Sequence, residues 1–92
     1  MVQPIYPPEA RAAHLEGDVI LDLTLAKDGS VYKINTLRGN PALAESARQA
    51  VAKWRYQPYL LNGIPVVVET EVTVKFRLTL KKQSAVVSKS PN

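Results

Sequence analysis

The residues that could carry out chemistry are few in this chain of 92 residues, and they lie far apart. There is no cysteine and a single histidine, His14, so a Ser/His/Asp constellation would depend on one residue in a short, exposed-looking helix. Asp18 and Asp22 share a face of a predicted strand but lie about 13 Å apart, too far for the usual pair of glycosidase carboxylates. No glycine-rich phosphate loop and no metal-spaced cluster occurs. We therefore expect no catalysis, no cofactor, no metal site and no small-molecule substrate.

An aromatic and basic stretch around Trp54 is the second candidate. Trp54 and Tyr56 could form a stacking platform for nucleic-acid bases, with affinity that falls steeply with salt. Alternatively, Trp54 anchors a helix on a sheet, because it continues an apolar stripe that begins at Leu43. The net charge of +4 is spread along the chain and does not require an acidic partner. We favour the structural interpretation of Trp54 and Tyr56 and expect no nucleic-acid partner.

Five elements must position these residues. A helix of about two turns follows Pro7-Pro8, where prolines suit the first turn. Strict alternation predicts a strand over 18–26, and an Asp28-Gly29 turn returns the chain as a second strand with a bulge near residues 33–36. Asn40 caps a helix that ends near Arg55 or Tyr56, before Pro58. After a loop with Asn62-Gly63 at positive φ, the last strand runs over residues 66–80.

The order of these elements predicts an α+β fold, α-β-β-α-β. The crossover helix brings the third strand beside the first, giving a three-stranded antiparallel sheet of order 2-1-3 with two helices packed on one face. The third strand, of about fifteen residues, would span roughly 50 Å and lie at the edge. We expect one domain over residues 1–80 and a flexible C-terminal tail over 81–92. No apolar run approaches the roughly 20 residues of a transmembrane helix.

A long edge strand presents a row of unpaired backbone groups. Its charged face, from Glu69 to Arg77, is typical of an edge protected against aggregation. Its length favours the other interpretation, in which an extended peptide adds to the edge by β-augmentation. On this interpretation Val74→Pro removes an edge donor and should abolish binding.

Several short motifs follow one another in a specific order. They are QPIYPPEARAAHLEGDV, the KDGSV turn, AVAKWRYQP at the end of the second helix, NGIPV, and VTVKFRL in the last strand. In this order and spacing, from about Gln3 to Leu80, the chain resembles the TonB C-terminal domain family.

The resemblance implies a periplasmic domain of an energy transducer. In that family an N-terminal helix, absent from this chain, anchors the parent in the inner membrane beside an ExbB/ExbD-type motor. The domain binds the TonB box of outer-membrane transporters as an added strand and passes on energy derived from the proton-motive force for active uptake. The resemblance assigns box binding to Gln3, Pro4, Tyr6, Pro7, Val72, Val74, Phe76, Leu78 and Leu80.

A second interpretation stays open beside this one. The chain could be an envelope adaptor whose long strand serves dimerisation or protein–protein contact without energy transduction. Short chains of the family exchange strands between copies, so a homodimer is expected as well. The upstream sequence of the parent would discriminate between a transducer and an adaptor.

Overall fold

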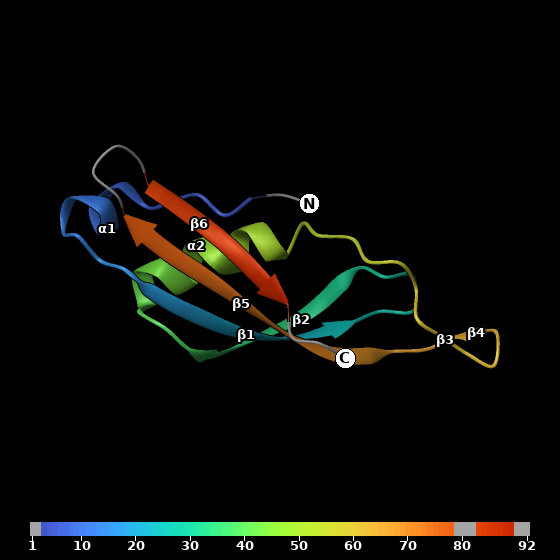
Figure 1. Ribbon diagram of the computed structural model, residues 1–92. Coiled ribbons are helices and arrows are strands. Elements are labelled where there is room, and N and C mark those ends of the chain that lie inside the picture. Colours follow the sequence, from blue (N-terminus) through green and yellow to red (C-terminus); the bar gives the residue numbers. More distant parts are fainter. Residues whose placement is uncertain (1–2, 79–82, 90–92) are drawn as a thin grey trace.

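Two helices and six strands form in residues 3–78 and 83–89, the part of the chain that the computed structural model describes (Figure 1). The helices are α1, Pro8–Ala12, and α2, Pro41–Val51; the strands are β1, Gly17–Leu25, β2, Val31–Arg38, β3, Leu60–Leu61, β4, Ile64–Pro65, β5, Val68–Leu78, and β6, Gln83–Lys89. The molecule is elongated, 49 × 22 × 20 Å along its principal axes. The predicted α-β-β-α-β order is confirmed, with β5 as the third long strand.

The main sheet is antiparallel and has the order β2-β1-β5-β6. Its first three strands confirm the predicted order 2-1-3. The fourth strand corrects two expectations: residues 83–89 are not a flexible tail, and β5 is not an edge where β6 pairs with it. The physical reason is that an open edge offers hydrogen-bonding groups to any extended segment, and this segment contains the strand-forming pair Val86-Val87.

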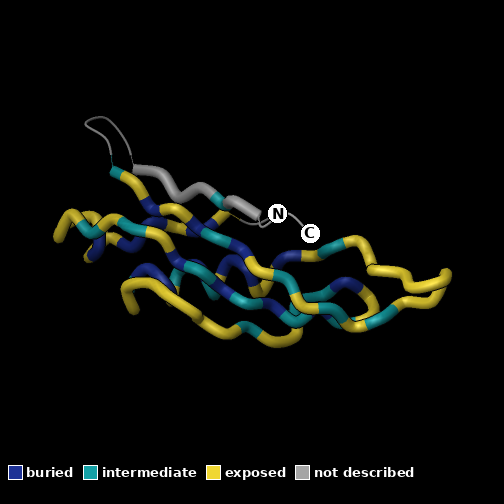
Figure 2. Tube along the Cα trace, turned by 60° about the horizontal axis from the view of Figure 1, so that its bottom comes forward, coloured by how far each residue is buried: buried dark blue, intermediate teal, exposed yellow. Residues whose placement is uncertain are grey.

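One face of the sheet is buried beneath both helices (Figures 1 and 2). Alternate residues of β1 and β5 point into this core, and apolar residues of α1, α2 and the N-terminal segment cover them. The core side chains include Tyr6, Ala10, Val19, Leu21, Leu23, Leu43, Ala47, Val51, Trp54, Val72, Val74 and Phe76. In the described residues neither helix is long and apolar enough to cross a bilayer.

The second helix begins as predicted and ends earlier. The Asn40 side chain accepts a hydrogen bond from the N–H of Ala42 at 2.9 Å, and Pro41 occupies the first turn. The helix ends at Val51, because the N–H groups of Lys53 and Trp54 donate to carbonyls three residues back and tighten the chain into a turn. Trp54 keeps its place in the apolar stripe although it lies beyond the helix, at 2% exposure.

Two other boundaries differ from prediction. The first helix has five residues instead of about two turns, and the long strand begins at Val68. The end predicted at Leu80 lies outside the described residues. The register of β2 with β1 is continuous from Lys33 to Thr36, where a bulge was predicted. The irregularities lie on either side of this stretch, at Tyr32 and Leu37, which have no partner in β1.

Candidate functional site: the outer edge of β5

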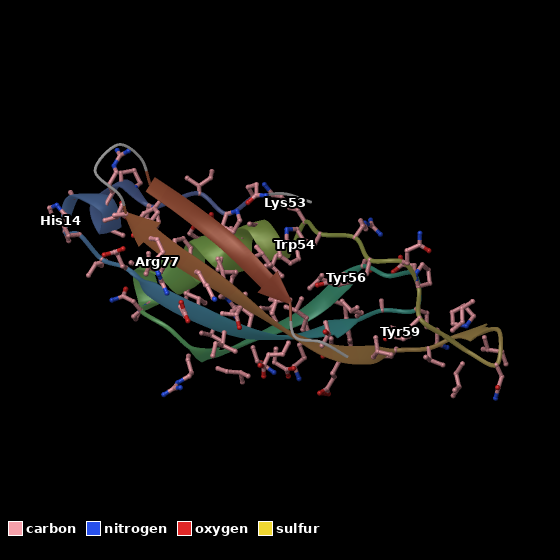
Figure 3. All side chains as sticks on the ribbon, in the orientation of Figure 1. His14, Lys53, Trp54, Tyr56, Tyr59 and Arg77 are labelled. Atoms are coloured by element: carbon pink, nitrogen blue, oxygen red, sulfur yellow. The ribbon has the colours of Figure 1, made fainter. Side chains whose placement is uncertain are left out.

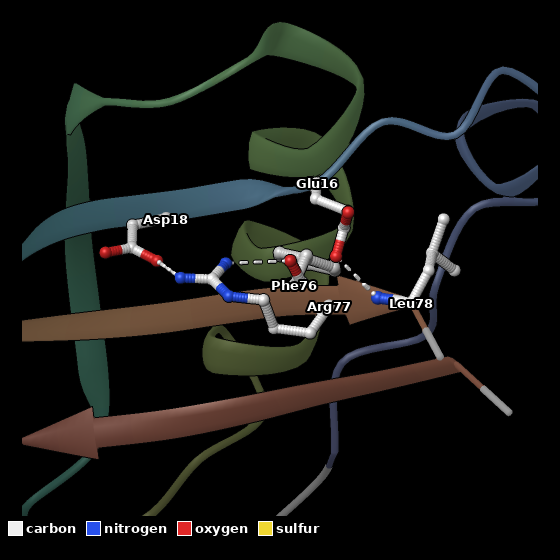
Figure 4. A network of polar contacts seen from close by, with 5 residues as sticks. All are labelled: Glu16, Asp18, Phe76, Arg77 and Leu78. Atoms are coloured by element: carbon white, nitrogen blue, oxygen red, sulfur yellow. Dashed lines mark hydrogen bonds and ion pairs between the residues drawn. The ribbon is translucent and has the colours of Figure 1, made fainter. Parts of the chain in front are cut away.

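The direction of the backbone groups along β5 decides which of them an added strand could reach. In an antiparallel pair, successive residues point their N–H and C=O groups alternately to the two sides. Oε1 of Glu16 accepts a hydrogen bond from the N–H of Leu78 at 2.8 Å, so Leu78 faces the β1 side (Figure 4). Because β5 pairs without a register shift, the residues that face away from β1 are Glu69, Glu71, Thr73, Lys75 and Arg77. We call this side of β5 the outer edge.

The first strand supports the same assignment independently. The N–H of Ala26 donates to the carbonyl of Ser30 at 2.8 Å, across the turn to β2. Even-numbered residues of β1 therefore face β2, and odd-numbered ones such as Val19 face β5. Val19 lies opposite Val74, so the backbone of Val74 faces β1. Val74→Pro would break the β1–β5 pairing, and the expectation that it removes an edge donor is wrong.

The outer edge has two parts. Strand β6 occupies it from Val72, opposite Lys89, to Leu78, opposite Gln83. From Val68 to Glu71, no strand of the described residues lies on this side. An extended peptide could therefore pair directly with the second part, or with the first part after β6 leaves it.

The side chains assigned to box binding on β5 lie mainly in the core. Val72, Val74 and Phe76 are fully buried, and Leu78 is half-buried. An added strand could not touch the three buried side chains, so they position β5 and leave recognition to its backbone. Leu80 lies outside the described residues.

The N-terminal segment is fixed against the same core. Pro4, Tyr6 and Pro7 are buried, and the Tyr6 ring meets Phe76 edge-on, with centroids 5.3 Å apart and planes at 86°. The Tyr6 hydroxyl donates to the carbonyl of Leu15, and burial raises its pKa, helped by the nearby Glu16 carboxylate. The structure thus brings Tyr6 and Phe76 together.

Gln3 is separate from that pair. It is exposed and lines a small depression beside α2 with Ile5, Ser46 and Lys53. The hydroxyl of Ser46 donates to the carbonyl of Ile5, which ties this segment to the helix. Gln3 therefore lies by α2, whereas Tyr6 lies against β5.

A network of polar contacts at the end of β5 is not evident from the sequence (Figure 4). Arg77 donates to the Asp18 carboxylate at 2.9 Å and to the carbonyl of Phe76 at 2.9 Å, while Glu16 holds Leu78. Both charged partners are nearly half exposed, so the ion pair is a modest contributor. The network ties the end of β5 to the start of β1. Opposite charges at Asp18 and Arg77 could have suggested it only once the strand register was known.

Trp54 and Tyr56 belong to the folded body and do not form an open platform (Figure 3). Trp54 is buried at 2% exposure, and its ring centroid lies 6.5 Å from that of Tyr56. Tyr56 is half-buried, and burial raises its pKa. A base-stacking platform needs open ring faces, which Trp54 does not offer. In the described part of the chain, no three acidic or histidine side chains gather as a metal site would require.

Comparisons with known proteins agree with this architecture. A profile of the family described as "Gram-negative bacterial TonB protein C-terminal" matches residues 2–78. The Protein TonB of Vibrio cholerae serotype O1 is 35% identical over 79 residues, covering 84% of this chain and 32% of that protein. The Protein TonB of Pseudomonas aeruginosa is 33% identical over 85 residues, covering 90% of this chain and 24% of that protein. This chain therefore spans a third or less of the length of these curated relatives.

A solved structure is also similar. The solution NMR structure of the Pseudomonas aeruginosa TonB CTD matches with a TM-score of 0.69 at 31% identity, covering 86% of this chain and 82% of that chain.

Proposed function

The chain belongs to the Gram-negative bacterial TonB C-terminal family, and on that premise we propose that it is the periplasmic, non-catalytic domain of an energy transducer. It binds the TonB box of outer-membrane transporters as an added strand on the outer edge of β5. The parent protein carries the inner-membrane helix and contacts an ExbB/ExbD-type motor. Through the added strand the domain passes on energy from the proton-motive force for active uptake.

The observation that carries this proposal is strand β6. A seven-residue segment pairs along the outer edge from Val72 to Leu78. The edge therefore accepts an added strand by backbone pairing, as β-augmentation requires. A transporter peptide of similar length would exchange one set of backbone hydrogen bonds for another, so displacing β6 costs little net hydrogen-bond energy.

The part of the outer edge on which the described residues place no strand gives the peptide a place to start. Between Val68 and Glu71, pairing needs no prior movement of β6. A peptide that pairs there first could then replace β6 step by step towards Leu78. The buried side chains of Val72, Val74 and Phe76 hold β5 in place while its outer backbone changes partner.

The test is an amide NMR titration of the domain with N-terminal peptides from outer-membrane transporters. Lys75→Pro removes an outward N–H group, and we expect it to weaken binding by about tenfold or more. Lys75→Ala is the matched control, because it loses the same exposed side chain but keeps the N–H, and it should bind as the wild type does. Equal affinity of a folded Lys75→Pro variant and the control would refute strand addition here.

A chain lacking residues 83–92 tests the role of β6. We expect it to bind the same peptides more tightly, because the outer edge is then open. Light scattering of both chains addresses the homodimer, since an open edge also accepts a second copy. If the shortened chain binds no peptide but dimerises, the adaptor interpretation replaces energy transduction.

A further inference from the structure

Exposed apolar side chains gather at one end of the long axis. Most of the large hydrophobic side chains that are exposed in the described residues belong to one projecting hairpin or to Tyr32 beside its base. Leu61 and Ile64, next to the turn, are 63% and 65% exposed. We call this group the apolar tip; its members are Tyr32, Tyr59, Leu60, Leu61, Ile64 and Val67. Such a cluster marks an interaction surface more often than scattered exposed residues do.

The hairpin of β3 and β4 is regular and extends away from the main sheet (Figure 1). Leu60 pairs with Pro65 and Leu61 with Ile64, and the N–H of Val66 donates to the carbonyl of Tyr59 at 3.0 Å. All residues from Gln57 to Pro65 are exposed (Figure 2). Because opposite residues share a face, Leu60 and Pro65 form one apolar face and Leu61 and Ile64 form the other.

Charge changes along the same axis. Residues 57–68 contain no charged side chain. At the base of the hairpin, Lys27 and Asp28 line a shallow depression of about 420 Å³ together with Tyr32 and Val67. The order from the turn inward is therefore aliphatic side chains, then tyrosines, then a pair of opposite charges. Aliphatic, tyrosine and charged side chains favour, in this order, the acyl region, the interface and the polar headgroups of a bilayer.

We propose that the apolar tip inserts shallowly into the surface of a lipid bilayer. A protein groove covers one face of a ribbon, whereas a lipid interface surrounds it, and this hairpin is apolar on both faces. Asn62 lies three positions after Tyr59, about 10 Å at strand spacing, which matches the roughly 5–10 Å depth of interfacial insertion. The polar turn limits insertion to that depth, and so do the outer backbone groups of the two strands, beside which the described residues place no further strand.

The experiment is cosedimentation of the full chain with vesicles of phosphatidylethanolamine and phosphatidylglycerol. The wild type should bind weakly and reversibly, and the double variant Leu61→Ser/Ile64→Ser should lose at least about fivefold in partitioning. Ile5→Ser is the matched control, because Ile5 is 76% exposed but lies outside the apolar tip. It should partition as the wild type does, and amide spectra should show all three chains folded.

Three results would overturn the proposal. The first is no sedimentation of the wild type with these vesicles. The second is equal partitioning of the double variant, which would assign binding to general basic charge. The third is a double variant that loses affinity for a transporter while no chain binds vesicles, which would make the apolar tip a protein contact. The vesicles contain no transporter, so this experiment tests the lipid contact independently of the peptide titration, which tests strand addition to β5.

Discussion

Two turns of this molecule carry nearly the same dipeptide, but one is packed against the rest of the chain and the other is exposed. Asp28-Gly29 joins β1 to β2, and Asn62-Gly63 joins β3 to β4. Both glycines have positive φ, +88° and +80°. A Cβ added at Gly29 would lie 1.9 Å from the carbonyl oxygen of Tyr56, whereas one added at Gly63 would meet nothing within 4 Å.

The difference shows what each turn is for. The first turn is part of the folded body: the N–H of Tyr56 donates to the carbonyl of Gly29 at 2.9 Å, and the Asp28 carboxylate accepts from the N–H and hydroxyl of Ser30. The second turn shapes a hairpin that projects from the body. The same sequence signal therefore contributes to stability at one end of β1 and to an exposed surface at the other turn.

The largest expected effect is that of Gly29→Ala. The new methyl group would overlap the Tyr56 carbonyl and force a positive φ on alanine, which together should lower the free energy of unfolding by roughly 3 kcal/mol or more. Urea denaturation followed by Trp54 fluorescence measures it, because Trp54 is buried near this turn's partner Tyr56. A loss no larger than that of Gly63→Ala would contradict the distinction between the two turns.

Gly63→Ala should have a smaller effect, about 1 kcal/mol, because only the backbone conformation opposes it and no atom is in the way. The strain should remain in the hairpin. Amide shifts are therefore expected to be largest in residues 59–67 and small in β1. Shifts that spread through the main sheet would mean that the hairpin is coupled to the body.

The main features of the fold could be predicted from the sequence, since apolar periodicity identifies β1, α2 and β5 and the order of elements fixes their arrangement. Strand β6 could not, because its sequence, QSAVVSK, has no alternating apolar pattern and backbone pairing with β5 requires none. The end of α2 was placed too late for a related reason: Trp54 stays in phase with the stripe through a non-helical turn.

The site was less predictable than the fold. Periodicity tells which side chains of β5 share a face, so Val74 and Phe76 were correctly grouped. It does not tell to which neighbour each backbone N–H points, because that depends on the register with β1. The outward residues Thr73, Lys75 and Arg77 could be identified only from the strand register together with the Glu16–Leu78 or the Ala26–Ser30 hydrogen bond.

A third, pH-dependent effect belongs to the first turn. Hydrogen bonds from the hydroxyl and N–H of Ser30, aided by Arg55, lower the pKa of Asp28. Because the pKa is lower in the folded state, the stabilisation is fully present above the ordinary aspartate pKa of about 3.9 and is lost as pH falls through the lowered value. Asp28→Asn should therefore have a lower free energy of unfolding than the wild type at neutral pH. The two values should converge in acid.

The control is Asn62→Asp in the projecting turn. Its new carboxylate is placed at an exposed position, so its pKa should stay ordinary and its stability difference from the wild type should not change with pH. Equal pH dependence of the two variants would show that the Ser30 hydrogen bonds do not stabilise the charged form of Asp28.

The smallest expected effect on stability is the most informative about function. Leu61→Ser/Ile64→Ser should change the unfolding free energy by no more than about 0.5 kcal/mol per site, because both side chains are largely exposed and bury little on folding. Two large aliphatic residues at such positions contribute little to folding, as the proposed contact of the apolar tip with a bilayer requires. A loss of several kcal/mol in urea denaturation would mean that the hairpin folds back on the body, and the apolar tip would then be core.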